Sequence, residues 1–390
     1  MNPRPVAISH LALTSTSTIL IALLVAGCAS APPKTEEEPH QGPSEVEIYL
    51  SFAQDYLGKQ TYPDAIKNFQ KVLELDSLNF AAYSGLAAAY IGKGRPDSAF
   101  YAYQKAVVVA PDDPRGYAGL GYVATENGSY AEALEHYRNA LEIDSQMSEA
   151  VFGVGYTYLQ LGQLDSAVTY LESAERLDST NLSIKYSLGE AYTKLKDYDR
   201  VIAKLQPVVV KHPEDIKAHI YLGDAYLDKK EYEKAIREFE IVLEYVPNYC
   251  SGVIKIGKCY QELGDTEKAS EYYKKSVEVD PENPVCWEHL ATLYIEIGKY
   301  GSALQTAEKA RELDPDDTLP YVLLGDAHKK IGDAYSNRKE RKKAIEEYEK
   351  AIKEYSRALH CPMYGEYART EIKRLGIRIQ KETLLDMEEF

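Results

Sequence analysis

The fold of this chain is decided by a short stretch, Tyr192-Thr193-Lys194-Leu195-Lys196-Asp197-Tyr198, in which polar residues separate two tyrosines. The pattern predicts a tight turn between two helices that bury the tyrosines on their inner faces. Tyr192 recurs 34 residues away in both directions, as Tyr158 and Tyr226. Repetition at a fixed interval of about 20 to 50 residues is typical of architectures built from stacked units.

The interval of 34 residues holds without a slip from residue 46 to residue 317, which gives eight units. Within each unit, positions 8 and 20 are small, and position 32 is proline or serine. Small residues let two helices approach closely, and proline ends a helix because it cannot continue the hydrogen-bond ladder. One unit cannot bury its apolar face alone, so neighbours must stack. The residues at position 8 are Ala53, Ala87, Gly121, Gly155, Gly189, Gly223, Gly257 and Ala291.

These units resemble the tetratricopeptide repeat, which carries an aromatic residue, Leu-Gly, Tyr, Ala, Phe and Pro at the same offsets. The resemblance implies an all-α fold, a right-handed solenoid of about nine stacked helix pairs with a C-terminal capping helix. The expected solenoid covers residues 46–358. Its units are expected at residues 46–79, 80–113, 114–147, 148–181, 182–215, 216–249, 250–283, 284–317 and 318–358.

The ninth unit departs from the others. Leu324-Gly325-Asp326-Ala327-His328 is followed seven residues later by the similar Ile331-Gly332-Asp333-Ala334-Tyr335. Seven residues are close to two helical turns, so we expect a lengthened first helix. Residues 359–390 are predicted to hold the cap, with a helix over Pro362–Leu375 and a weakly ordered tail over Gly376–Phe390.

Residues 1–27 are predicted to be a removable signal peptide. Leu24-Val25-Ala26-Gly27-Cys28 resembles the bacterial lipobox, which implies cleavage after Gly27 and lipidation of Cys28. The alternatives are an ordinary secretory signal or an uncleaved anchor. Residues 28–45 would then hold the lipidated cysteine and a flexible linker. Lipidation implies a place in the bacterial cell envelope, and Ala29 favours the periplasmic face of the outer membrane in a Gram-negative cell.

Composition narrows the range of functions. The chain has 45 basic and 61 acidic residues, which disfavours nucleic-acid binding because phosphate attraction needs a basic surface. No motif for nucleotide binding, metalloprotease activity or a serine nucleophile occurs. We therefore expect no enzyme, no catalytic residue, no cofactor, no metal and no small-molecule substrate. Cys286 and His289, with Cys259, are a weak zinc candidate, because zinc needs three or four ligands.

The alternative, which we expect, is that Cys250, Cys259, Cys286 and Cys361 are free thiols that behave as small apolar groups. The secreted location leaves room for a disulfide, but the repeat spacing offers no obvious pair of cysteines within about 7 Å. The basic run Arg338-Lys339-Glu340-Arg341-Lys342-Lys343 is a solvated turn in the simpler interpretation. The alternative is a contact with anionic lipid, polysaccharide or an acidic partner.

Binding in this family occurs in a concave groove lined by first-helix positions 2, 5, 9, 12 and 13. Aromatic residues there bury large area at small entropic cost, and acidic neighbours favour a basic partner. The alternative is that the tyrosines pack against neighbouring helices. The groove lacks the Lys/Asn set with which some members clamp a C-terminal carboxylate. The predicted groove residues are Tyr122, Glu126, Phe152, Tyr156, Leu159, Tyr186, Glu190, Asp224 and Leu227.

The expected function is a membrane-tethered scaffold or adaptor of the assembly-factor type, which binds a protein or peptide in the groove. The lipid on Cys28 would confine that groove near its membrane partners and raise its effective concentration there. The alternative is a glycan- or peptidoglycan-associated protein whose groove aromatics stack on sugar rings.

Overall fold

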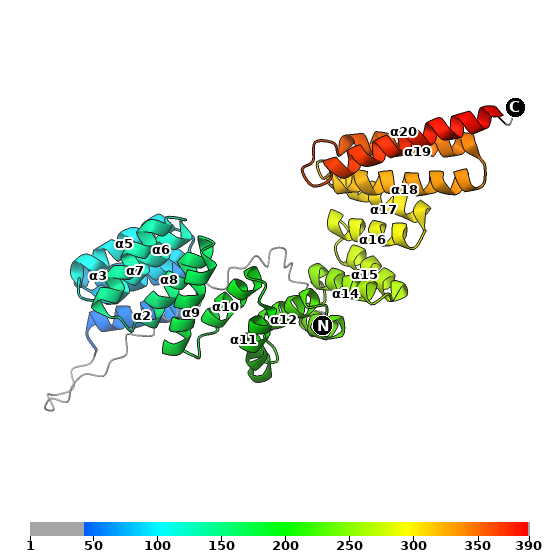
Figure 1. Cartoon of the computed structure of the whole chain (residues 1–390). Coiled ribbons are helices and arrows are strands. Elements are labelled where there is room, and N and C mark those ends of the chain that lie inside the picture. The colour runs from blue at the N-terminus through cyan, green and yellow to red at the C-terminus, as the bar shows by residue number, and fades with distance from the viewer. Residues whose placement is uncertain (1–42, 389–390) are drawn as a thin grey trace, which may run out of the picture. The chain divides into compact units, whose positions relative to one another are not determined.

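The computed structural model describes residues 43–388, and those residues form nineteen α-helices and no strand (Figure 1). The helices alternate between first and second members of antiparallel pairs, so the predicted all-α solenoid is confirmed. The first helices are α2 (Glu45–Gly58), α4 (Phe80–Gly92), α6 (Pro114–Glu126), α8 (Ser148–Gln160), α10 (Leu182–Lys194), α12 (Ile216–Asp228), α14 (Cys250–Glu262), α16 (Pro284–Glu296) and α18 (Leu319–Asn337).

The second helices are, except for the last, 14 residues long, and a single helix follows them at the end of the chain. The second helices are α3 (Tyr62–Leu75), α5 (Pro96–Val109), α7 (Tyr130–Ile143), α9 (Leu164–Leu177), α11 (Tyr198–Lys211), α13 (Tyr232–Tyr245), α15 (Thr266–Val279), α17 (Tyr300–Leu313) and α19 (Arg341–Arg357). The single final helix is α20 (Gly365–Glu388). The chain also divides into two larger compact parts between Leu205 and Gln206, within α11. Each part contains several 34-residue repeats, and the two parts are called the first unit and the second unit below.

The turn after Tyr192 closes as its sequence predicts. The backbone N–H of Asp197 donates to the carbonyl of Tyr192 at 2.8 Å. Lys196 adopts a φ of 58°, in the left-handed region, where five other turns of the described chain carry glycine. A side chain in this region costs free energy because Cβ crowds the backbone. Lys196 therefore occupies, at a cost in free energy, the turn position that glycine fills in those five turns.

Tyrosine-on-glycine contacts hold neighbouring helices together in the first unit. The ring of Tyr137, on α7, lies against both Gly121 of α6 and Gly153 of α8. A Cβ atom on Gly153 would lie 2.2 Å from the Tyr137 ring, so no larger residue fits there without a shift. Tyr137 is buried. The small residues of the repeat are therefore the sockets into which second-helix aromatics insert.

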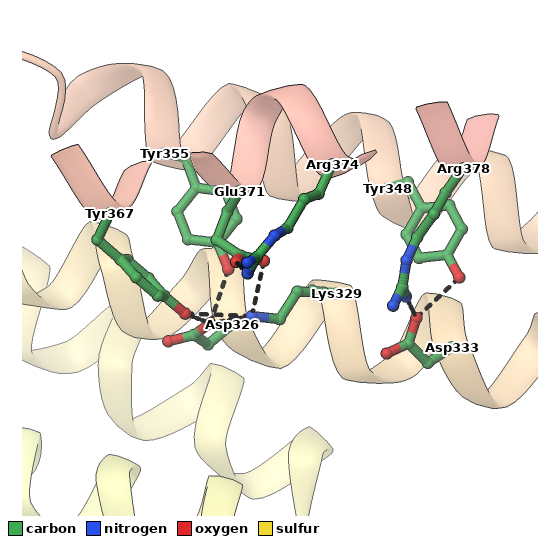
Figure 2. Close-up of polar contacts among 9 residues, drawn as sticks. All are labelled: Asp326, Lys329, Asp333, Tyr348, Tyr355, Tyr367, Glu371, Arg374 and Arg378. Carbon is green, nitrogen blue, oxygen red and sulfur yellow. Dashed lines mark hydrogen bonds and ion pairs between the residues drawn. The ribbon is translucent and has the colours of Figure 1, made fainter. Parts of the chain in front are cut away.

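The last helix pair differs from the others because α18 has 19 residues where α16 has 13. Two sockets lie along α18. Tyr355 of α19 packs on Gly325, and Tyr348 packs on Gly332. Each socket is followed by an aspartate that accepts a hydrogen bond from its tyrosine, Asp326 at 2.7 Å and Asp333 at 2.8 Å (Figure 2). The repeated sequence motif therefore makes the same contact twice.

The final helix packs along α19 and α18, as Figure 1 shows. The prediction of a tail after Leu375 was wrong, because α20 continues to Glu388. Its inner face extends beyond Gly376 through Ile379, which packs on the core of the last helix pair, and Glu382, which is buried. Ser336 donates a 2.5 Å hydrogen bond to Glu382, and Arg341 forms an ion pair with it. These contacts stabilise the segment that the composition alone assigned to a tail.

Candidate partner-binding surface

Most of the predicted groove residues lie on α6, α8 and α10, three consecutive first helices of the first unit. α8 packs against both α6 and α10. This close approach buries the aromatic side chains that we expected to face a partner. Tyr122 and Phe152 are each 5% exposed, and Tyr186 is 7% exposed. In the free chain these rings contribute to packing, and they offer little of their own area to a ligand.

Two further predicted residues differ from each other in burial. Leu159 is fully buried. Tyr156 is half-buried and stacks on Phe152, with ring centroids 6.0 Å apart. Thr125 of α6 and Thr157 of α8 also join these two helices, through a buried 2.9 Å hydrogen bond between their hydroxyls. This polar contact fixes the register of α6 against α8.

A small pocket lies at the C-terminal end of α6. Its volume is about 220 Å³, and it is lined by Ile91, Pro96, Tyr122, Val123, Glu126 and Asn127. Two predicted groove residues, Tyr122 and Glu126, therefore share one pocket with α4 and with the start of α5. The walls are mainly apolar, and Glu126 contributes the carboxylate. Such a pocket suits a side chain with an aliphatic stem and a cationic end.

The Glu126 side chain reaches solvent, yet the protein atoms around its carboxyl group displace enough water to raise its pKa. Desolvation disfavours the charged form of a carboxyl group unless a cation lies nearby. No described lysine, arginine or histidine forms an ion pair with Glu126. A cation supplied by a binding partner would therefore be attracted to this carboxylate.

The other predicted acids already have cationic neighbours. Glu190 forms an ion pair with Lys194 at 2.9 Å, one turn further along α10. In the second unit, Asp224 of α12 forms a 2.6 Å ion pair with Lys255 of α14. Burial raises the pKa of Asp224, while Lys255 acts in the opposite direction. Leu227 is half-buried on the same helix. Of the predicted acids, Glu126 is thus the one without an internal counter-charge among the described residues.

The sequence interpretation missed a second hollow, which lies at the turns before α6 and α8. Its volume is about 840 Å³, and its lining includes Asp112, Asp113, Asp144 and Glu149 with a single cation, Arg115. Arg115 is engaged by Asp113 at 2.6 Å. The available signal was the recurrence of aspartate near the ends of successive units. Asp112, Asp113 and Asp144 lie outside the first-helix positions to which the groove prediction applies.

The basic run at residues 338–343 covers the turn between α18 and α19 and the first three residues of α19. Lys339 takes a φ of 63°. Arg341 pairs with Glu382 of α20, and Lys343 pairs with Glu340 at 2.6 Å. Part of the run is therefore used to hold the last helices together.

The three residues of the zinc candidate lie on two helices, Cys259 on α14 and Cys286 with His289 on α16. His289 stacks on Tyr273 with centroids 5.4 Å apart, and Cys259 is buried on α14. Over residues 43–388 there is no group of three or more His, Cys, Asp or Glu side chains arranged to hold a metal ion. The expectation that no two cysteines approach each other was wrong, because the sulfurs of Cys250 and Cys286 lie 2.8 Å apart. The spacing of the repeat does not reveal this contact, because Cys250 is the first residue of α14 whereas Cys286 is the third residue of α16.

The predicted lipidation site, Cys28, lies outside the described residues. Among the helices of residues 43–388, none is both long enough and apolar enough to cross a membrane.

Four models described as tetratricopeptide repeat match the chain, over residues 50–148 in two overlapping segments, 216–249, 260–325 and 326–356. A model described as anaphase-promoting complex, cyclosome, subunit 3 matches residues 126–208. No curated protein matches.

Solved structures with the same fold include the APC/C hetero-tetramer Cut9-Hcn1, with a TM-score of 0.50 and 19% identity. That match covers 72% of this chain and 55% of the other, so this chain spans about half the length of its neighbour. A tetratricopeptide repeat protein from Parabacteroides merdae matches at 18% identity and a TM-score of 0.45, over 64% of this chain and 98% of that one. YrrB, whose structure is described as having an unusual peptide-binding site, matches at 22% identity and a TM-score of 0.38, over 56% and 95%.

Proposed function

We propose that this chain, which belongs to the tetratricopeptide repeat proteins, is a scaffold that binds a protein partner through the first unit and has no catalytic role. The observation that carries the proposal is the pocket formed by Tyr122 and Glu126 with Ile91 and Pro96. Its carboxylate is desolvated and has no counter-charge among the described residues. The partner that fits is a protein or peptide segment with an exposed lysine or arginine.

Different residues of the pocket would contact different parts of the partner's basic side chain. Ile91 and Pro96 would contact the aliphatic stem of the partner's basic side chain, which buries apolar area. Glu126 would pair with the charged end, and a charge pair in a partly desolvated site is worth more than one in open water. The more distant carboxylates Asp112, Asp144 and Glu149 would attract a basic segment and increase its association rate.

The proposal also includes attachment to the bacterial cell envelope through a lipid on Cys28. The support for it is the sequence Leu24-Val25-Ala26-Gly27-Cys28, which resembles a lipobox. Two or more acyl chains hold a protein stably at a membrane. The outer membrane is the expected site in a Gram-negative cell. A Cys28→Ala variant should then leave the membrane fraction, and continued partition with membranes would contradict the tether.

Affinity capture with the full chain tests the partner proposal. Glu126→Lys should lose most of the captured protein, because it places a like charge against the partner's cation. Glu135→Lys is the matched control, because Glu135 is an exposed carboxylate on α7 with the same change of charge. Equal recovery by the two variants would contradict the role of the pocket. Binding of purified peptidoglycan fragments without any protein partner would instead favour the glycan alternative.

A further inference from the structure

Two cysteines of the second unit meet at the junction of consecutive helix pairs. Cys250 is the first residue of α14, and Cys286 is the third residue of α16. Their sulfur atoms lie 2.8 Å apart, closer than two non-bonded sulfurs normally approach. Of the four described cysteines, Cys250, Cys259, Cys286 and Cys361, only these two come together. The pair therefore has the proximity that a disulfide requires.

The two thiols differ in their surroundings. Cys250 is partly exposed and its sulfur also lies 3.7 Å from the carbonyl oxygen of Ser276, whereas Cys286 is 0% exposed. Either sulfur can act as the donor of the hydrogen bond between the two thiols. The same bond raises the pKa of Cys250. Because Cys250 is the partly exposed member of the pair, its sulfur is the one that a reagent meets first.

We propose that Cys250 and Cys286 are a redox modification site, a dithiol that closes to an intrachain disulfide when it meets a disulfide oxidant such as oxidised glutathione. Cys250 loses its proton and attacks one sulfur of the oxidant, which releases one thiol and leaves a mixed disulfide on Cys250. Cys286 then loses its proton and attacks the Cys250 sulfur, which releases the second thiol. Two protein thiols are oxidised by two electrons, and one small disulfide is reduced to two thiols that carry the two protons.

The bond would join the first helices of two consecutive pairs, α14 and α16, which pack against each other. It would close a loop between residues 36 apart in sequence. A cross-link of this kind stabilises a fold mainly because it restricts the unfolded chain. In a stack whose stability depends on contacts between neighbours, it would stiffen one junction of the second unit.

The test treats the full chain, at low protein concentration, with an excess of oxidised glutathione and then maps the cysteines by alkylation and peptide mass. The expected result is a linked pair of peptides that contains Cys250 and Cys286, lighter than the two reduced peptides by two hydrogen atoms. Cys259→Ala is the control, because it removes the other thiol of α14, which is buried, and should leave the linked pair intact. Cys286→Ser should instead trap glutathione on Cys250.

Two results would overturn the proposal. One is that Cys250 and Cys286 both remain open to alkylation after denaturation of the oxidised sample. The other is that the linked peptide arises only between two molecules, as a dimer on a non-reducing gel. Stability provides a second measurement that does not depend on the mapping. Oxidation should raise the urea midpoint reported by the fluorescence of Trp287, which adjoins Cys286, and the rise should vanish in Cys250→Ser but persist in Cys259→Ala.

Discussion

The hydroxyl of Tyr355 donates a 2.7 Å hydrogen bond to the carboxylate of Asp326, and so joins α19 to α18. The same carboxylate accepts hydrogen bonds from Tyr367 of α20 at 2.6 Å and from Lys329 at 2.7 Å (Figure 2). Lys329 extends the network to Glu371 of α20 at 3.2 Å. Burial opposes the charge of Lys329, but Asp326 and Tyr367 outweigh it and raise its pKa. Three helices therefore meet at one acceptor.

Removal of that acceptor should loosen the final helix. Asp326→Ala leaves two phenols and one ammonium group without their shared partner, at a cost of about 2 to 4 kcal/mol in the free energy of unfolding. The amides of α20 should then exchange with solvent faster than in the parent chain. Asp316→Ala, at an exposed position in the turn before α18, is the control. Unchanged exchange in α20 would show that apolar packing alone holds the cap.

Replacement of glycine by alanine should have opposite effects at a glycine that contacts an aromatic ring and at a glycine that meets no neighbouring atom. Gly153→Ala places a Cβ 2.2 Å from the Tyr137 ring, so the ring must move, and we expect destabilisation by about 1 to 3 kcal/mol. Gly376→Ala meets no atom within 4 Å and lies inside α20, so it should stabilise by about 0.5 to 1 kcal/mol. Urea denaturation followed by circular dichroism measures both. A loss of stability at Gly376 would argue against a helix that continues through that residue.

The turn at Lys196 predicts a stabilising substitution. Lys196→Gly relieves a side chain held at a φ of 58°, and we expect a gain of about 1 kcal/mol. Lys196→Ala removes the same lysine but keeps Cβ, so it should bring no comparable gain. Thermal unfolding of the two variants makes the comparison. If alanine and glycine stabilised equally, the effect would come from the charge and not from the backbone.

Glu288 predicts a dependence of stability on pH. Burial, together with the neighbouring Asp317 carboxyl group, raises the pKa of Glu288 from 4.5 to about 8. The folded chain then holds this proton more tightly than the unfolded chain, so the free energy of unfolding should fall as pH rises from about 4.5 to about 8. Glu288→Gln, which is neutral throughout, should be more stable than the parent chain by about 1 to 3 kcal/mol at pH 8 and nearly equal at pH 4.5.

The measurement is urea denaturation at both pH values, followed by Trp287, the one tryptophan of the chain, which adjoins Glu288. Glu282→Gln, at an exposed site in the preceding turn, is the control and should leave the pH dependence unchanged. Parallel pH profiles for the parent chain and Glu288→Gln would contradict the raised pKa.

The helix pairs could be predicted from the sequence because a period of 34 residues specifies which positions share an environment. The period does not specify how closely consecutive first helices approach, which is why the burial of Tyr122, Phe152 and Tyr186 had to come from the structure. The period also relates only residues that occupy equivalent positions in different repeats. Cys250 and Cys286 occupy different positions in their units, so their contact was not visible as a repeat. Glycine at position 376 predicts the end of a helix, because a glycine by itself gives no sign of the buried face that continues beyond it.

The group formed by α18, α19 and α20 also limits how the chain can change in length. Two glycine sockets on α18 are filled by tyrosines from α19, and α20 covers the face on which a tenth pair would have to stack. A duplicated copy of residues 284–317 would meet neighbours of its own kind on both sides. The same copy placed after α19 would have to displace α20 and its polar contacts. Growth or shortening of this array by whole units is therefore confined to the positions that precede α18.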